Sequence, residues 1–126
     1  MDFYNEVQEV CEHAIKILTR KKLQFRPMRR KNNHVNTKRG FVIGRTSLKT
    51  GLITIDIFTP KQRREKKISS ILRTLAHEIA HHQKKPFRER YKGRWIIRQH
   101  FPSFYNRVNK NVEKIKKDSV LKSYFQ

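Results

Sequence analysis

The chain has 126 residues and a mass of 15.3 kDa, with 31 Lys and Arg residues against 10 Asp and Glu, which gives a formal net charge of +21. This length suits one domain, expected to span residues 1–126, and the single cysteine, Cys11, excludes an intrachain disulfide and a multi-thiolate zinc site. Uncharged stretches are far shorter than the roughly 18 apolar residues of a membrane span, and acidic residues stand where a secretory signal would be basic, so we expect a cytoplasmic protein with no membrane contact.

The first half of the chain predicts one helix and a small sheet. Apolar residues recur at three- and four-residue spacing from Phe3 to Leu18, which indicates an amphipathic helix over about residues 2–21. The alternating stretch 23–25 is a candidate strand. The β-branched and aromatic runs 40–44 and 51–58 predict a hairpin, which Pro60 ends, and a basic linker follows at 61–67.

The second half predicts two more helices. An apolar stripe indicates a helix over 68–82, whereas residues 84–99 mix charges and aromatic residues with Pro86 and Gly93, which predicts irregular structure or a short helix. Pro102 suits the first turn of a third helix, which runs to about Lys117, and the tail 119–126 is expected to be flexible. Because strands and helices do not alternate, we expect an α+β domain with helices on one face of a sheet of about three strands.

The helix over 68–82 contains the motif H-E-x-x-H as His77-Glu78-Ile79-Ala80-His81. Residues four apart share one helix face, so the two imidazoles can converge on one tetrahedral cation such as Zn²⁺. Glu78 is turned about 100° from His77 around the helix axis, where its carboxylate can act on a water as general base. The motif therefore predicts one zinc ion per chain, with Glu78 as the catalytic residue.

A catalytic zinc usually has three protein ligands, so a third ligand is expected beyond the motif. The candidates are His100, Glu89 and Glu113. We favour His100, because a short turn ahead of Pro102 could present it to the site, while a solvated helix face is the default interpretation of Glu113.

Residues that follow the motif exclude one class of zinc peptidase and one candidate ligand. Lys84 and Phe87 stand where the glycine and the third histidine of a metzincin would fall, which excludes that class. His82 is turned about 100° from His81, so we expect it at the surface or behind the ligands rather than on the metal.

The octapeptide T-L-A-H-E-I-A-H at 74–81 and the hexapeptide H-F-P-S-F-Y at 100–105 together resemble the SprT-like and YgjP (WLM-type) zinc metallopeptidases. The resemblance covers about residues 40–110. It implies a minimal zincin domain, zinc held by His77, His81 and His100, and Glu78 as general base. Members of the SprT group cleave proteins bound to DNA, which implies a polypeptide substrate near nucleic acid.

The large positive charge independently favours a polyanionic partner such as nucleic acid. The candidate contacts are basic residues in two segments: Arg29, Arg30, Lys31, Arg88, Arg90, Lys92 and Arg94. The aromatic rings at 87, 91 and 95 have helical spacing. We expect them to anchor this connection on the core, the alternative being a ridge that stacks on single-stranded bases. Tyr91 and Tyr105 are candidate oxyanion donors or substrate contacts.

Three functional hypotheses remain open at the level of sequence. The leading one is a zinc-dependent endopeptidase that holds its substrate along an edge strand. The stretch 75–82 also resembles ImmA/IrrE-type regulatory proteases and minigluzincins, which use a glutamate as third ligand. The third hypothesis is a basic nucleic-acid-binding protein with a non-catalytic metal site.

Overall fold

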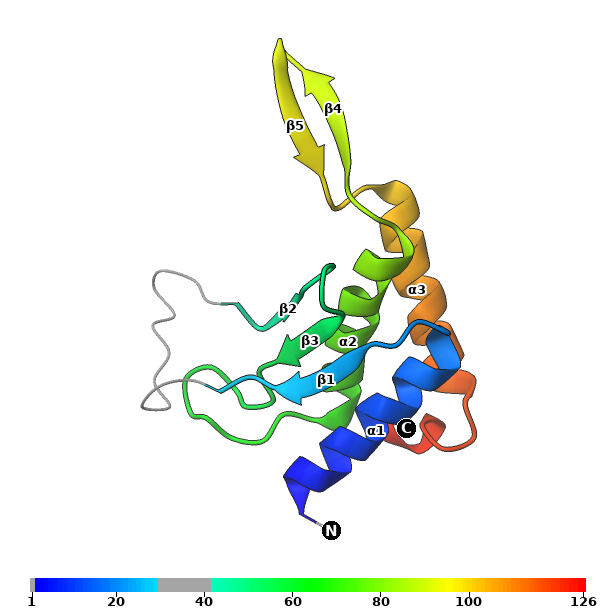
Figure 1. Ribbon diagram of the computed structural model, residues 1–126. Helices are drawn as coiled ribbons and strands as arrows, with labels where there is room; N and C mark the ends of the chain where they lie inside the picture. Colours follow the sequence, from blue (N-terminus) through cyan, green and yellow to red (C-terminus); the bar gives the residue numbers. More distant parts are fainter. Residues whose placement is uncertain (1, 30–41) are drawn as a thin grey trace.

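A computed structural model describes residues 2–29 and 42–126 of the chain. Figure 1 shows the arrangement of its elements in space. In chain order the elements are α1 (Phe3–Leu18), β1 (Gln24–Pro27), β2 (Gly44–Thr46), β3 (Leu52–Ile55), α2 (Ile68–Gln83), β4 (Phe87–Tyr91), β5 (Arg94–Arg98), α3 (Pro102–Lys117) and the 3-10 helix η3 (Lys122–Phe125).

The three-stranded sheet has the order β1-β3-β2, which makes β3 central and leaves β1 and β2 at the edges. Strand β3 pairs in parallel with β1 and antiparallel with β2. Helices α1 and α2 pack against the sheet, and α3 packs against both helices. This confirms the predicted α+β fold class and the predicted β2–β3 hairpin.

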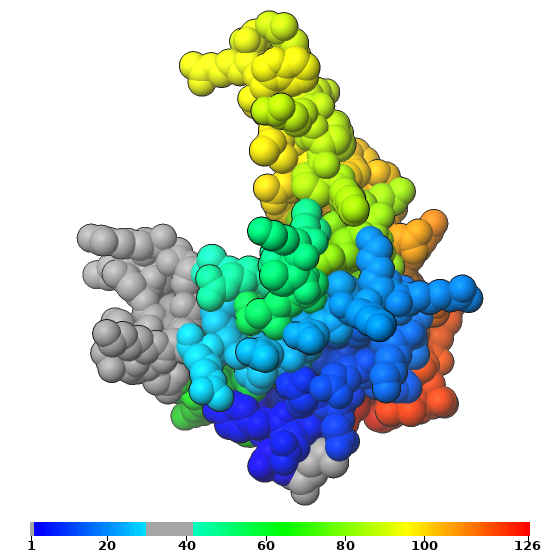
Figure 2. Space-filling model, viewed as in Figure 1, coloured from blue at the N-terminus to red at the C-terminus, as the bar shows by residue number. Residues whose placement is uncertain are grey.

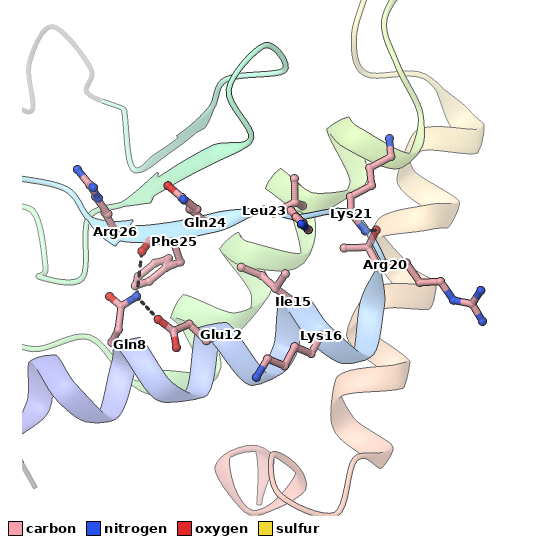
Figure 3. Close-up of a pocket in the computed structure, with 12 residues that line it drawn as sticks. Gln8, Glu12, Ile15, Lys16, Arg20, Lys21, Leu23, Gln24, Phe25 and Arg26 are labelled. Atoms are coloured by element: carbon pink, nitrogen blue, oxygen red, sulfur yellow. Dashed lines mark hydrogen bonds between the residues drawn. The ribbon is translucent and has the colours of Figure 1, made fainter.

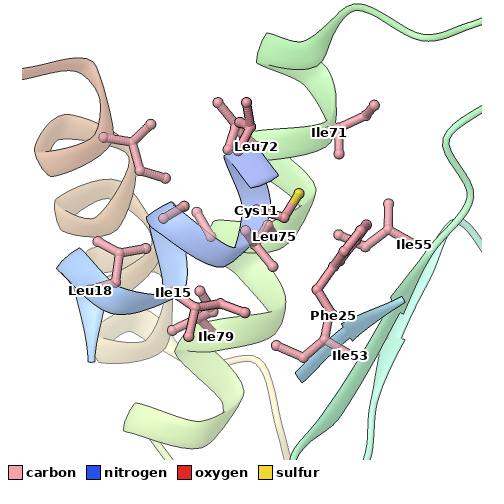
Figure 4. Packing of buried hydrophobic residues seen from close by; sticks show 14 of the residues in the cluster. Cys11, Ile15, Leu18, Phe25, Ile53, Ile55, Ile71, Leu72, Leu75 and Ile79 are labelled. Atoms are coloured by element: carbon pink, nitrogen blue, oxygen red, sulfur yellow. The ribbon is translucent and has the colours of Figure 1, made fainter. Parts of the chain in front are cut away.

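The core lies between the sheet and the first two helices (Figure 4). Helix α1 buries one stripe that includes Cys11, α2 buries Leu72 and Leu75, and β3 contributes Ile53 and Ile55; all five are no more than 1% exposed. These positions are the apolar ones that the helical and strand periodicities select. The core therefore fixes which face of α2 is turned away from the sheet.

Several boundaries differ from the prediction. Helix α1 ends at Leu18 rather than near residue 21, because Thr19 adopts an extended backbone while its N–H still bonds to the carbonyl of Ile15. Strand β2 begins at Gly44, where the predicted run 40–44 ends; residues 40 and 41 lie outside the described part of the chain. Strand β3 ends at Ile55, after which the carboxylate of Asp56 is buried in an ion pair with Arg63.

The prediction of irregular structure or a short helix over 84–99 is wrong. The segment forms an antiparallel hairpin in which β4 pairs with β5 from Phe87↔Arg98 to Tyr91↔Arg94. Lys92 and Gly93 connect the strands with φ of 50° and 76°, which is the left-handed conformation that a two-residue hairpin turn requires. The rings at 87, 91 and 95 suggested a helical period, whereas the backbone follows the period of two.

Side-chain amides join the three long helices. Asn111 of α3 donates to the carbonyl of Ala76 and to the side chain of Gln83, both in α2, and Gln83 donates in turn to the carbonyl of Leu18 at the end of α1. Each bond satisfies a helix carbonyl or a buried amide that would otherwise lack a partner. The last turn of α2 is thereby held by both neighbouring helices.

The C-terminal residues pack against the helices. Leu121 is fully buried in the core, and the hydroxyl of Tyr124 donates to Glu6 of α1 at 3.1 Å. The flexibility expected for 119–126 stays a prediction about motion. None of the described helices has the length and apolar character needed to cross a lipid bilayer.

Candidate active site

Helix α2 presents both histidines of the motif on one side. The ring centroids of His77 and His81 lie 5.0 Å apart, as expected for residues one helical turn from each other. The neighbouring residues Leu75, Ala76 and Ile79 are fully buried in the core, so the packing of α2 on the sheet fixes where the two rings point.

The third histidine reaches these rings from another part of the chain. His100 lies in the short connection between β5 and α3, and its ring centroid is 5.3 Å from that of His77 and 4.9 Å from that of His81. One potential ligand atom from each of the three residues lies within 4.8 Å of the other two. The three residues favoured as ligands on sequence grounds are thus brought together.

The other candidate ligands have partners elsewhere. Glu89 lies in β4, where its carboxylate accepts a hydrogen bond from Arg98 of β5 at 2.7 Å. Glu113 is exposed on α3, and its carboxylate is 3.9 Å from the ammonium of Lys116. In the described part of the chain, neither carboxylate belongs to a group with the three histidines.

Phe104 forms the floor beneath all three imidazoles. It is fully buried, and its ring centroid lies 5.0 Å from His77, 4.5 Å from His81 and 5.2 Å from His100. In the sequence, Phe104 belongs to the hexapeptide 100–105 that carries the family resemblance, but no contact with the ligands was predicted for it. His100 precedes the first residue of α3, so its spacing from Phe104 gives no helical signal, and the contact follows only from the packing of α3 against α2.

Glu78 lies in the cleft beside the histidines. The cleft has a volume of about 570 Å³ and is lined by α2, by β2 and by the connection that carries His100. Glu78 is 6% exposed, and burial raises the pKa of its carboxyl to about 7. A Cβ at Gly44 would be 3.3 Å from the Glu78 carboxylate oxygen Oε1, so β2 passes directly over this side chain.

The electrostatics of the site favour neutral imidazoles. Burial lowers the pKa of His77, as does the charge of His100. Burial also lowers the pKa of His81, to about 4, together with the charges of the neighbouring histidines. Neutral imidazole is the form that binds a metal ion.

His82 lies behind the ligands and joins the active-site helix to the sheet. It is 5% exposed, and its Nε2 is hydrogen-bonded to the hydroxyl of Thr46 in β2. The ammonium of Lys21 donates to the carbonyl of His82 at 2.6 Å. The first contact attaches the edge strand β2 to the last turn of α2, and the second attaches the connection between α1 and β1. The burial of His82 excludes the surface position that was one of its two expected locations.

The two candidate tyrosines occupy different places. Tyr105 is half-exposed and stacks on His100, with ring centroids 6.1 Å apart. Tyr91 ends β4 and directly precedes the hairpin turn, whereas His100 follows the opposite end of β5. Tyr105 is therefore the tyrosine that contacts the site.

The basic residues predicted to contact nucleic acid lie in different parts of the structure. Arg29 is exposed just after β1, and Arg30 and Lys31 lie outside the described residues. The remaining four, Arg88, Arg90, Lys92 and Arg94, all belong to the β4–β5 hairpin or its turn.

A larger hollow lies between α1 and β1, away from the histidines (Figure 3). It has a volume of about 840 Å³, and its lining residues include one carboxylate, Glu12, and no histidine or cysteine. The amide of Gln8 donates to Glu12 and to the carbonyl of Phe25. This hollow lacks the grouped histidine ligands of a zinc site, so the smaller cleft at Glu78 is the candidate active site.

Comparison with known proteins gives one structural likeness. No protein-family model and no curated protein matches the chain. A solved structure described as the metallopeptidase zymogen of Pyrococcus abyssi abylysin is 25% identical, with a TM-score of 0.47, over 94% of this chain and 87% of that chain.

Proposed function

We propose that this chain is a zinc-dependent metalloendopeptidase. The observation that carries the proposal is the convergence of the potential ligand atoms of His77, His81 and His100 within 4.8 Å of one another, beside the buried carboxyl of Glu78. Three protein ligands with one position left open are typical of catalytic zinc, whereas structural zinc sites are closed by four.

The residues present fit a zinc ion. Imidazole nitrogen is a favoured zinc ligand, and the lowered pKa values of His77 and His81 keep these rings neutral near pH 7. Phe104 beneath the rings excludes water from one side of the site. When bound, zinc supplies Lewis-acid polarisation of a peptide carbonyl and lowers the pKa of a water molecule toward about 7.

Glu78 supplies the acid–base chemistry. Its carboxylate accepts a proton from the attacking water, and the carboxylic acid so formed returns that proton to the leaving amine. A pKa of about 7 allows the same group to act in both directions at neutral pH.

Strand β2 supports the binding of an extended polypeptide. It is an edge strand, and just before it the carbonyl of Ile43 accepts a hydrogen bond from the backbone N–H of Asp56, which directly follows β3. Backbone groups alternate in direction along an antiparallel strand, so those of Gly44 and Thr46 point away from β3. A substrate strand pairing there would place its backbone next to Glu78.

Tyr105 is proposed as the oxyanion donor or substrate contact in preference to Tyr91, because it stacks on His100. Tyr105→Phe should lower kcat with little change in KM, while Tyr91→Phe should leave kcat unchanged. The reverse result would assign the role to Tyr91.

The substrates proposed are polypeptides held on or near nucleic acid. The support is the net charge of +21, because a nucleic acid would offset the self-repulsion of the chain and concentrate proteins bound to it. The cytoplasmic location expected from the sequence stays a prediction.

The central test uses Glu78→Gln. This isosteric change should keep one zinc per chain, measured by elemental analysis, and should reduce hydrolysis of an unfolded fluorescent protein substrate by about 100-fold or more. Glu113→Gln, on the exposed face of α3, is the matched control and should keep full activity. Full hydrolysis by a metal-clean, zinc-reloaded Glu78→Gln variant would refute the proposed role.

A further inference from the structure

The β4–β5 hairpin projects from the domain as a separate arm, seen at the top of Figures 1 and 2. Among the described elements, β4 and β5 pack only against each other. Every residue of β4 is exposed, and β5 has no buried residue. A lone two-stranded hairpin has little stability of its own in water, so we expect a binding partner to cover this arm.

The arm leaves large apolar side chains in water. Trp95 is 64% exposed, Ile97 62% and Tyr91 51%. The expectation that the aromatic rings anchor this segment on the core is therefore wrong for Trp95 and Tyr91. Within the described part of the chain, only Phe87, at the base of the arm, contacts a ring outside it, that of Phe101, in an edge-on arrangement with ring centroids 5.0 Å apart.

The charges of the arm indicate the class of partner. Its basic side chains are Arg88, Arg90, Lys92, Arg94 and Arg98. The one acidic side chain, Glu89, is paired with Arg98. A surface with this excess of positive charge is complementary to a polyanion.

Each face of the ribbon carries at least one exposed ring with basic side chains beside it. The register places Trp95 opposite Arg90 and Ile97 opposite Arg88, and the guanidinium of Arg90 lies 5.7 Å from the indole centroid. On the other face, the ammonium of Lys92 lies 5.3 Å from the Tyr91 ring centroid. Phosphate-binding groups thus stand directly beside flat, exposed aromatic surfaces.

We propose that the β4–β5 hairpin binds single-stranded nucleic acid. An unpaired base stacks on Trp95, and backbone phosphates contact Arg88 and Arg90 on the same face of the ribbon. In a duplex the base faces are already stacked on one another, so exposed rings favour the single strand. The inference specifies the nucleic-acid contact of the proposed function and does not depend on hydrolysis.

The experiment uses the zinc-loaded Glu78→Gln chain, so that binding is measured without cleavage. Trp95 is the sole tryptophan, which makes its fluorescence a direct report on the arm. We expect a single-stranded oligothymidylate to quench this fluorescence, and a duplex of equal length to quench it much less.

Matched variants separate stacking from charge, with affinity measured by fluorescence anisotropy of a labelled oligonucleotide. Trp95→Ala should weaken single-strand binding about ten- to one-hundredfold, whereas Tyr4→Ala, which removes another exposed ring on α1, should have little effect. The double variant Arg88→Ala/Arg90→Ala should weaken binding and flatten its salt dependence more than Lys110→Ala/Lys114→Ala on α3.

The outcomes are decisive in either direction. Quenching by the single strand together with loss of affinity in Trp95→Ala supports the proposal. Absence of quenching, equal effects of the two charge pairs, or single-strand affinity that Trp95→Ala leaves unchanged would overturn it. Because hydrolysis is not measured, a failed arm leaves the peptidase proposal intact, and a failed peptidase leaves the arm intact.

Discussion

Gly44 is the point at which β2 lies closest to the active-site helix, and adding one methyl group there tests that geometry. A Cβ at this position would be 2.8 Å from Cγ2 of Thr74 and 3.3 Å from Oε1 of Glu78. Gly44 does not have a positive φ, so Gly44→Ala introduces crowding without backbone strain.

The expected destabilisation follows from two opposing terms. Overpacking of a closed interface costs about 1–3 kcal/mol, whereas replacing glycine by alanine in a compatible conformation returns about 0.4–1 kcal/mol through the unfolded state. The net loss is about 1–2 kcal/mol, which corresponds to a fall in Tm of about 4–8 °C for a domain of this size.

Activity should fall more than stability. The hydrogen bond from the Thr74 hydroxyl to the carbonyl of Ser70 holds this side chain in its rotamer, so we expect β2 to move by about 0.6 Å to restore an ordinary contact of 3.4 Å with Cγ2. This displacement separates the substrate strand from Glu78, and shifts of about 1 Å can cost on the order of a hundredfold in rate. We expect kcat/KM on the unfolded protein substrate to fall at least tenfold, with zinc content unchanged.

Thr74→Ser supplies the matched rescue. Serine retains the hydroxyl, which donates to the carbonyl of Ser70, and lacks the methyl group that the new Cβ would meet. The double variant Gly44→Ala/Thr74→Ser should therefore recover most of the lost Tm and activity. If Gly44→Ala matches the parent chain, or if Thr74→Ser fails to rescue it, the close approach of β2 to α2 described here is incorrect.

Three further changes test other parts of the structure. His100→Ala should abolish stoichiometric zinc binding in elemental analysis while Glu89→Ala preserves it, and the opposite pattern would assign the third ligand to the glutamate. Phe104→Ala should lower the free energy of unfolding by about 3–5 kcal/mol in urea titrations and weaken zinc binding, whereas Tyr105→Ala on the exposed face should do far less on both counts. Asp56→Asn removes the counter-charge of Arg63, whose side chain is 10% exposed, and should lower the free energy of unfolding by about 3–5 kcal/mol. Glu89→Gln breaks an exposed ion pair and should lower it by only about 0–1 kcal/mol. Equal losses would contradict the burial of Asp56.

The three long helices and the convergence of the three histidines could be predicted from the sequence, for physical reasons. Amphipathic periods over four turns leave little ambiguity, and Pro102 marks the first residue of α3. The i, i+4 spacing of His77 and His81 is a local property of a helix, so it needs no knowledge of the tertiary structure. His100 required only that the next helix pass near the motif.

The parts that were missed depend on contacts between distant segments. The parallel pairing of β1 with β3 joins strands that are far apart in the chain, and no local pattern encodes it. The hairpin over 87–98 was missed because its rings coincide with a helical period, although Gly93 after Lys92 was the available turn signal. The packing of Phe104 against the three imidazoles, and of Gly44 against Thr74 and Glu78, appears only once α3 and β2 are placed against α2.

The hydrogen bonds made by the side-chain amide of Gln83 affect how the proposed site would lose its metal. Helix termini are ordinarily the first places where a folded chain opens, and His81 stands in the final turn of α2. Anchoring that turn to Leu18 and Asn111 gives the ligand the rigidity of a helix interior. Fraying of this terminus would release one ligand of the proposed zinc ion while the hydrophobic core stayed assembled. The lifetime of the zinc-bound chain would therefore be set by the hydrogen bonds of two side-chain amides rather than by global unfolding.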